Sequence, residues 1–307
     1  MRALVARGLD EPELIEIAVP EPAAGQVRIK VAAAAVNPVD LAVNAGLAVQ
    51  FGLTAARPQF GLGWDVAGTV DAVGPGVDLQ PGTAVVGLAD LLGRALKTHA
   101  EYVVLDTDAV TRAPQNVDLT AASTFPLNAS TALQAYTTLQ REPGQTVLVT
   151  GAAGGVGGYA IELGKHFGLT VIASAAAEDE ELVRRLGADH FVPRSHDLSA
   201  AVREIVPQGV DGLIDAAIVG VGAQEAVRNG GRHVHLQGGP LPPHLRGITV
   251  VQQFVHATRT VLDELVRLIE AGVVSTRVAE TYPLDDAAAA YARLAKGGVR
   301  GRLVLRP

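Results

Sequence analysis

The stretch that decides the fold of this chain is Thr146-Val147-Leu148-Val149-Thr150-Gly151-Ala152-Ala153-Gly154-Gly155-Val156-Gly157-Gly158, in which a β-branched run ends in glycines. Helix-forming residues follow, so a strand should turn sharply into a helix here. Small residues at such a turn let a pyrophosphate approach the backbone, where the N–H groups of the helix start point at it. We therefore expect a dinucleotide to bind at Gly151, Ala152, Ala153, Gly154, Gly155, Val156 and Gly157.

The spacing of this turn is A-x-G-x-x-G, whereas the usual motif is G-x-G-x-x-G, and a lone glycine motif is a weak signal. A glycine-rich turn that binds nothing is the alternative. The context favours binding, because residues 159–167 have a helical pattern, residues 170–173 form an apolar run, and residues 178–186 are amphipathic. Further β-like runs at residues 209–215, 232–236 and 248–251 predict a doubly wound, parallel Rossmann sheet of about six strands.

The first hundred residues differ, since they are rich in valine, glycine and proline and contain short β-like runs separated by turns. We expect a β-rich domain over residues 1–118 and the dinucleotide-binding domain over residues 119–265. Residues 266–307 contain a helical pattern and a last strand with no further α/β unit to complete. They should therefore return to the first domain.

Length and composition exclude several classes of protein. The chain has 307 residues, a net charge of −7 and no cysteine. The charge, without a basic cluster, argues against nucleic-acid binding. The missing cysteines exclude disulfides, thiol catalysis and cysteine-ligated metals, so redox chemistry would need a bound cofactor. No apolar run reaches the roughly 20 residues that span a bilayer, and the first residues indicate a strand, so we expect a cytoplasmic protein.

Several blocks together resemble the medium-chain dehydrogenase/reductase superfamily, specifically its zinc-independent quinone oxidoreductase branch. They cover nearly the whole chain and are Val36-Asn37-Pro38-Val39-Asp40, Gly63-Trp64-Asp65-Val66-Ala67-Gly68-Thr69-Val70, Thr98-His99-Ala100-Glu101-Tyr102-Val103, Ser130-Thr131-Ala132, the glycine turn, Leu186-Gly187-Ala188-Asp189 and Gly297-Gly298-Val299-Arg300-Gly301-Arg302. The resemblance implies an α/β protein in which a GroES-like catalytic domain accompanies the Rossmann domain.

The resemblance also indicates whether the chain binds a catalytic zinc ion. Zinc-dependent relatives carry cysteine, histidine and cysteine where this chain has Asn37, Trp64 and Leu127, and neither tryptophan nor leucine can bind a metal. Their structural zinc lobe is missing as well. Without a Lewis acid, acceptors that delocalise the charge created by hydride delivery are favoured. We therefore expect reduction of quinones or α,β-unsaturated carbonyl compounds, and no metal.

The second strand of the predicted sheet indicates which nicotinamide cofactor binds. It ends Ala173-Ser174-Ala175-Ala176, without the acidic residue that NAD enzymes use for the ribose 2′-hydroxyl. Arg194 falls where relatives contact the 2′-phosphate, and Ser174 could add a hydroxyl, so we favour NADPH over NADH. Glu178-Asp179-Glu180 has the wrong charge for a phosphate, although it could belong to the next helix. Arg194 could equally be an exposed loop arginine.

The resemblance assigns the remaining site residues. Asn37, Asp40, Trp64 and Thr131 are the candidate catalytic residues. Candidate cofactor contacts outside the glycine turn and the second strand are Asn128, Thr131 and Arg302. Gln237, Gly238 and Gly239 are further candidates because they follow a predicted strand at its carboxyl end, where open α/β sheets bind ligands, although they could form a plain turn. Each has an ordinary alternative: Asp40 could hold a loop, Trp64 could be a core residue, and the polar residues near Thr131 could be small core side chains.

His233 and His235 alternate with Val234 on a predicted strand, without the spacing of a metal motif, so we interpret the histidines as scattered. Two functions remain open: an NADPH-dependent reductase, and a cofactor-binding protein with little turnover, such as a crystallin-like protein or a redox sensor. The apolar run at residues 248–252 should form a sheet edge, and relatives pair this edge in a homodimer.

Overall fold

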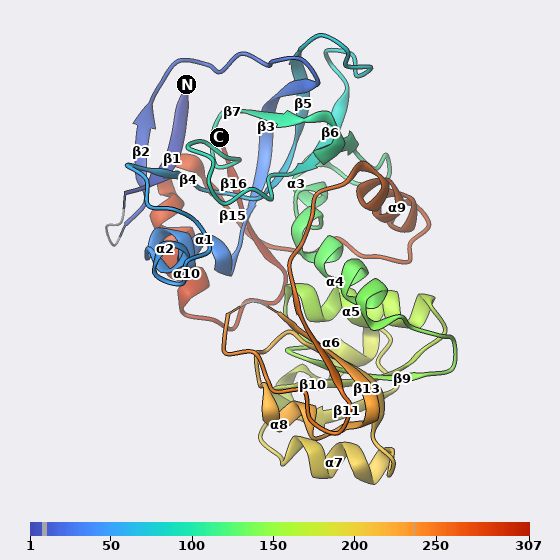
Figure 1. Ribbon diagram of the computed structural model, residues 1–307. Coiled ribbons are helices and arrows are strands. Elements are labelled where there is room, and N and C mark those ends of the chain that lie inside the picture. Colours follow the sequence, from blue (N-terminus) through green and yellow to red (C-terminus); the bar gives the residue numbers. More distant parts are fainter. Residues whose placement is uncertain (8–10, 237) are drawn as a thin grey trace. The chain divides into compact units, whose positions relative to one another are not determined.

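The computed structural model covers residues 1–307 and describes all of them except residues 8–10 and residue 237. Internal contacts divide the chain into two compact units (Figure 1). The β-rich unit comprises Met1–Leu127, His256–Ala271 and Thr276–Pro307. The parallel-sheet unit comprises Asn128–Val255 and Gly272–Ser275.

The described residues of the parallel-sheet unit form six strands in the order β11-β10-β9-β12-β13-β14, and every neighbouring pair is parallel. The strands are β9 (Thr146–Thr150), β10 (Thr170–Ala175), β11 (His190–Pro193), β12 (Val210–Asp215), β13 (Val227–Leu236) and β14 (Thr249–Gln253). The chain runs outward from β9 to β11, then returns beside β9 and runs outward in the other direction. Ligands of open α/β sheets bind at such a reversal, outside the carboxyl ends of the strands. The predicted Rossmann sheet is confirmed.

Helices connect these strands. They are α4 (Pro126–Leu139), α5 (Gly155–His166), η2 (Ala177–Asp179), α6 (Glu180–Arg185), α7 (Leu198–Ile205) and α8 (Val221–Gln224). Leu148, Ile172 and Leu213 of the sheet pack in one core cluster with Val202 of α7. The central strands are continuous apolar runs because helices cover parallel sheets on both faces.

The β-rich unit contains two sheets. One has seven strands in the order β15-β16-β3-β5-β6-β8, with β7 also paired to β3, and the other has the order β2-β1-β4. The strands are β1 (Arg2–Ala6), β2 (Glu13–Glu16), β3 (Gln26–Val36), β4 (Phe60–Gly61), β5 (Asp65–Val73), β6 (Ala84–Leu88), β7 (Tyr102–Asp106), β8 (Val110–Arg112), β15 (Val278–Pro283) and β16 (Arg302–Arg306). Strand β16 pairs with β3, so the last strand of the chain belongs to a sheet of the β-rich unit.

The helices of the β-rich unit are α1 (Pro38–Asn44), α2 (Leu47–Gln50), η1 (Thr107–Ala109), α3 (Leu119–Ala122), α9 (Arg259–Glu270), η3 (Leu284–Asp286) and α10 (Ala287–Ala295). In the described part of the chain, no helix is both long enough and apolar enough to cross a membrane.

The unit boundaries differ from those expected from the sequence, at residues 118 and 265. Helix α3 packs on β3 and β5, and α9 packs on β8, where Asp263 accepts a hydrogen bond from Thr111. Both helices therefore belong to the β-rich unit, which ends its first segment at Leu127 and resumes at His256. The helical pattern gave no sign of which sheet each helix covers.

Candidate active site

The glycine turn lies between β9 and α5, which begins at Gly155 with Gly154 as its N-cap. Gly151 has a φ of 59°, in the left-handed region that favours glycine. A Cβ on Gly157 would overlap the carbonyl oxygen of Gly151, so the start of the helix packs more closely on the turn than a side chain would allow. The first N–H groups of a helix have no partner inside it. The turn therefore offers backbone donors to an anion, at the reversal of the strand order.

The carboxyl ends of β9 and β12 are joined through Thr150 and Asp215. The Thr150 hydroxyl donates to Asp215 Oδ1 over 2.6 Å and accepts the backbone N–H of Ala217 over 3.1 Å. Asp215 also accepts the N–H of Val219 at Oδ1, over 3.0 Å, and that of Gly220 at Oδ2, over 2.7 Å. These bonds position the loop after β12 beside the end of β9.

A cavity of about 460 Å³ lies at the same carboxyl edge, between the loops that follow β12 and β13. Its lining consists of Ile218, Val219, Gly220, Val221, Gly222, His235, Pro240, Leu241, Pro242 and Pro243. Gly238 and Gly239, two of the predicted cofactor residues, lie against Ile218, since a Cβ on Gly239 would be 2.6 Å from Ile218 Cγ2. Gln237, a third, is outside the described residues. The cavity lies where this type of sheet binds ligands.

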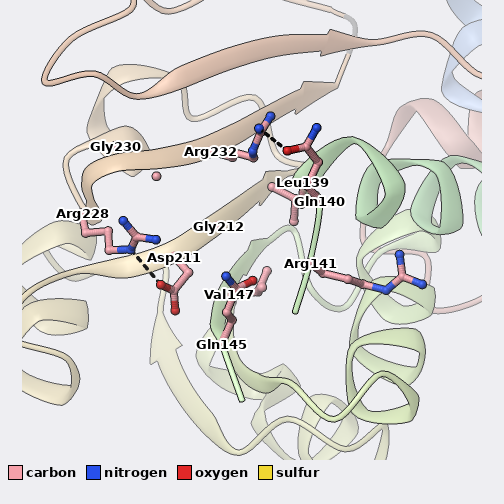
Figure 2. A pocket seen from close by; sticks show the side chains of 11 residues that line it. Leu139, Gln140, Arg141, Gln145, Val147, Asp211, Gly212, Arg228, Gly230 and Arg232 are labelled. Carbon is pink, nitrogen blue, oxygen red and sulfur yellow. Dashed lines mark hydrogen bonds and ion pairs between the residues drawn. The ribbon is translucent and has the colours of Figure 1, made fainter. Parts of the chain in front are cut away.

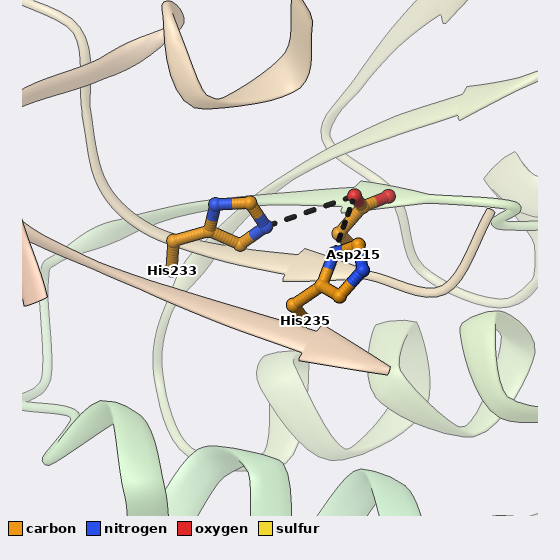
Figure 3. Close-up of side chains that lie close together, drawn as sticks. All are labelled: Asp215, His233 and His235. Carbon is orange, nitrogen blue, oxygen red and sulfur yellow. Dashed lines mark hydrogen bonds and ion pairs between the residues drawn. The ribbon is translucent and has the colours of Figure 1, made fainter. Parts of the chain in front are cut away.

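Figure 3 shows that His233 and His235 both point at Asp215, so the interpretation of these histidines as scattered is wrong. His235 Nδ1 lies 3.3 Å from Asp215 Oδ2, and His233 Nε2 lies 3.6 Å from it. Alternation along β13 directs both rings to one face, and the parallel register places Asp215 opposite His235. All three side chains are fully buried.

Two histidines and an aspartate are ligands that transition metals use. An ionised carboxylate, however, has about four acceptor positions. Those of Asp215 already receive the Thr150 hydroxyl, two backbone N–H groups and His235. A metal would have to displace one of these donors, so we infer that the cluster holds the loop after β12. Within the described chain neither nitrogen of His233 has a hydrogen-bond partner.

The end of β10 carries the residues predicted to select the cofactor. Ser174 is buried, and the carbonyl oxygen of Ala175 accepts the backbone N–H of Arg194 over 2.7 Å. Arg194 is thereby held beside the end of β10 with its side chain exposed. Glu180, from the acidic run, forms an ion pair of 2.8 Å with Arg184 within α6. This agrees with the alternative that the run belongs to the helix.

Helix α4 carries the predicted residues Asn128 and Thr131. They are three residues apart and so share a face of the helix. Asn128 is buried and Thr131 half-buried, whereas the hydroxyl of Ser130 between them is fully buried and has no hydrogen-bond partner in the described chain. The two predicted residues are placed together, and Ser130 fits the alternative of a small core side chain.

A smaller hollow, of about 80 Å³, lies at the opposite ends of β9, β12 and β13 (Figure 2). Its arginines have partners: Arg228 forms an ion pair of 2.7 Å with Asp211, Arg232 donates to Gln140, and Arg141 lies over the ring of Phe167. The hollow is at the amino ends of the strands, away from the glycine turn. It is not part of the candidate site.

In the β-rich unit, the candidate residues surround Asp65, which is fully buried at the start of β5. Asp65 accepts the backbone N–H of Leu127 over 2.6 Å and the side-chain amide of Asn37 over 2.8 Å. Arg302 lies 3.9 Å from Asp65 and donates to the Asn37 side-chain oxygen. Burial raises the pKa of Asp65 to about 6, although Arg302, Leu127 and Asn37 oppose that shift.

Two members of this network, Asn37 and Leu127, stand at positions where the resemblance implies zinc ligands in zinc-dependent proteins. The Asn37 amide donates to Asp65 and accepts from Arg302, and Leu127 contributes only its backbone N–H. These residues do not fit a zinc ion. Arg302, predicted to contact the cofactor, is buried here and also donates to the carbonyl oxygen of Val36 over 2.9 Å. Its guanidinium balances the charge of Asp65 within this unit.

Asp40, a candidate catalytic residue, is fully buried at the start of α1. Its Oδ2 accepts the backbone N–H of Asn37 over 2.9 Å, and its Oδ1 accepts that of Gly63 over 2.7 Å. Both oxygens therefore bind backbone, which agrees with the alternative that Asp40 holds a loop.

Trp64 is buried beneath a lysine that the sequence did not single out. The Nζ atom of Lys97 lies 3.4 Å from the centroid of the indole ring, and only 3% of Lys97 is exposed. Burial lowers the pKa of Lys97 to about 7, opposed by Asp40, Asp90 and Asp65. A buried amine that titrates near neutral pH marks a functional candidate.

His99 is the other titratable side chain next to Lys97 that the sequence left unassigned. Its Nδ1 lies 3.0 Å from the Tyr291 hydroxyl and its Nε2 lies 3.1 Å from the carbonyl oxygen of Ala35. Burial lowers the pKa of His99. Both ring nitrogens are engaged, so His99 holds β3 and α10 in place.

Comparison with known proteins supports the sequence-based assignment. Residues 23–115 match the alcohol dehydrogenase GroES-like domain, and residues 186–305 match the zinc-binding dehydrogenase family. The NADPH-dependent alkenal/one oxidoreductase of Arabidopsis thaliana chloroplasts is 34% identical over 302 residues, which cover 95% of this chain and 74% of the relative.

Solved structures agree with this. An NAD-dependent alcohol dehydrogenase is 33% identical with a TM-score of 0.88, and each chain is covered completely. The quinone oxidoreductase from Coxiella burnetii is 26% identical with a TM-score of 0.87, covering 100% of this chain and 99% of that one. The predicted combination of a GroES-like and a Rossmann domain is confirmed.

Proposed function

Because the chain belongs to the medium-chain dehydrogenase/reductase superfamily, in its quinone oxidoreductase-like branch, we propose that it is an NADPH-dependent reductase of quinones or α,β-unsaturated carbonyl compounds. When bound, NADPH supplies a hydride to the acceptor. The low-turnover binding protein considered above has no specific feature in its favour.

The observation that carries this proposal is the glycine turn at the reversal of the strand order. The contact that Gly157 makes with Gly151 leaves no room for a side chain, and the turn opens on a helix start. A dinucleotide pyrophosphate fits such a turn. The loops after β12 and β13, with Gly238 and Gly239, would hold the nicotinamide end, together with Asn128 and Thr131 of α4.

The choice of NADPH rests on the end of β10. Ser174 and Ala175 provide no carboxylate for a ribose 2′-hydroxyl, and the backbone bond to Ala175 keeps Arg194 nearby. A guanidinium is well suited to bind a 2′-phosphate. The relatives differ in cofactor, since one is named NADPH-dependent and another NAD-dependent.

The residues around Asp65 support the proposed class of hydride acceptor. Asn37, Trp64 and Leu127 do not provide ligands for zinc, so carbonyl polarisation by a metal is not available at these positions. Quinones and enones tolerate this, because they delocalise the negative charge that hydride addition creates. We also propose that the chain forms a homodimer through β14, which lies at the edge of its sheet.

Steady-state assays of the purified protein test this function. We expect oxidation of NADPH with 1,4-benzoquinone or a 2-enal, a slower reaction with NADH, and none with a saturated ketone. Metal analysis should show no stoichiometric zinc, and chelators should leave the rate unchanged. Activity that requires a full equivalent of zinc, or NADPH binding without turnover of any acceptor, would contradict the proposal.

A further inference from the structure

The reaction proposed above creates negative charge on the acceptor and requires a proton, so the β-rich unit should contain a donor that is not already engaged. Asn37 is engaged at both ends of its amide, and both nitrogens of His99 have partners. Asp40 and Asp65 accept hydrogen bonds from backbone groups. Lys97, in contrast, donates no hydrogen bond to any described residue.

The fold holds Lys97 over Trp64 by close backbone packing. A Cβ on Gly61 would lie 2.5 Å from the backbone nitrogen of Lys97, so this segment runs directly against β4. On either side, Gly61 N–H donates to the carbonyl oxygen of Arg94, and His99 N–H to that of Leu62, both over 2.9 Å. The backbone on both sides of Lys97 is therefore fixed, and its ammonium group lies on the indole face of Trp64.

The charges around the amine are mixed. Asp40, Asp65 and Asp90 favour its ammonium form, whereas Arg94 opposes it. Burial is the largest effect, and it brings the pKa of Lys97 to about 7. An amine in this state can both give up and regain a proton at neutral pH, as a general acid must.

We propose that Lys97 is the proton donor of this reductase, and that its ammonium group stabilises the charge on the acceptor before the proton moves. This inference rests on the proposed function. Hydride addition brings two electrons to the β-carbon of an enone and leaves an enolate. One Nζ–H bond of Lys97 then breaks as a C–H bond forms at the α-carbon, or an O–H bond on a quinone oxygen. The neutral amine regains its proton from water.

The first test measures the state of Lys97 without any turnover. Trp64 is the single tryptophan of the chain, so its fluorescence reports the charge above its ring. We expect a transition with a midpoint near pH 7 in the native protein and in Lys165→Met, a matched control whose ammonium pairs with Asp189 in the other unit. Lys97→Met should lose this transition, although a change near pH 6 from Asp65 can remain.

The second test is kinetic. Lys97→Met should lower kcat for a 2-enal by about 100-fold or more, with little change in KM for NADPH, since general acids contribute this much. In the native protein kcat should fall above pH 7, as Lys97 loses its proton. This fall should be absent in Lys97→Met. Lys97→Arg keeps the positive charge without a titratable proton. It should therefore recover part of the rate, and its kcat should not fall above pH 7.

The outcomes are distinguishable. A native kcat and pH profile in Lys97→Met, or a transition near pH 7 that survives in it, would overturn the role of Lys97 alone. A native protein that oxidises no NADPH with any acceptor would overturn the proposed function and this role together, whatever the fluorescence shows.

Discussion

In the β-rich unit the buried carboxylate of Asp65 accepts two hydrogen bonds, from Leu127 and Asn37, whereas in the parallel-sheet unit Asp215 accepts four. Burial disfavours the ionised form of both carboxyl groups, but the outcome differs. At Asp65 burial prevails and brings the pKa to about 6. At Asp215 the imidazole of His233, the Thr150 hydroxyl and the backbone N–H groups of Gly220 and Val219 outweigh burial, and the pKa lies well below its usual range.

The difference indicates that the two carboxylates have different roles. Asp215 remains ionised at any physiological pH, so it is suited to hold a loop at the edge where a dinucleotide would bind. Asp65 and Lys97 both titrate near neutral pH, which suits groups around a proton transfer. We therefore expect changes in the parallel-sheet unit to affect binding and stability, and changes near Lys97 to affect turnover.

The largest expected effect is on the glycine turn. Gly154→Val should reduce affinity for NADPH by 100-fold or more, because its side chain would occupy the space of the pyrophosphate. The fold should persist, since Gly154 has a φ of −79°, which any residue can adopt, and the Gly151 oxygen, 3.1 Å from a Cβ built there, would have to move by only a few tenths of an ångström. Binding titration and circular dichroism measure the two effects. Gly154→Ala should be milder, and a folded valine variant with native affinity would remove the turn from the site.

Asp215→Asn should lower the free energy of unfolding by about 2–4 kcal/mol at neutral pH, because an amide cannot accept four hydrogen bonds. The stabilisation that the native carboxylate contributes is present above its unfolded pKa, about 4, and is lost as the pH falls further. In urea unfolding, the difference in stability between the native protein and Asp215→Asn should therefore be smaller at pH 3 than at pH 7. Asp285→Asn, which removes an exposed ion pair with Arg2, should have a much smaller effect on the free energy of unfolding. Equal losses in the two variants would refute the structural role of Asp215.

Arg194→Ala should weaken NADPH binding by roughly 10- to 100-fold, which corresponds to about 1.5–3 kcal/mol, and leave NADH binding unchanged. We expect only a modest preference for NADPH in the native protein, because the acidic residues at the start of α6 have the wrong charge for a phosphate. Titration with both cofactors measures it, with Arg306→Ala as a control that removes the same charge from an exposed position. An equal loss for both cofactors would mean that Arg194 only holds its loop.

Lys97→Met should stabilise the protein by about 1–3 kcal/mol below pH 7, since it removes a buried ammonium group at the expense of its contact with Trp64. The pKa of Lys97 is lower in the folded state than the usual 10.4, so the native penalty is complete below pH 7 and disappears as the pH rises to about 10. In urea unfolding, Lys97→Met should be more stable than the native protein at pH 6.5 and equally stable at pH 10. A variant less stable than the native protein at pH 6.5 would contradict the pKa shift.

The sequence predicted the fold well where one local pattern determined it. The β-branched run before Gly151 predicted β9, and the helical pattern after it predicted α5. The later apolar runs predicted β10, β12, β13 and β14. The predictions were weaker where two distant segments meet. Lys97 looks like a surface residue until Gly61 brings its backbone against β4. Likewise, the two histidines of β13 meet Asp215 only through the parallel register with β12.

The central claim is that a chain without zinc ligands at this site reduces conjugated acceptors with NADPH. The most direct measurement compares NADPH consumed with saturated aldehyde formed from a 2-enal, using protein treated with a chelator and shown to be free of zinc. The account predicts equal amounts of the two, with many turnovers per protein molecule. NADPH that binds and is not consumed, or turnover that returns only when zinc is added, would contradict it.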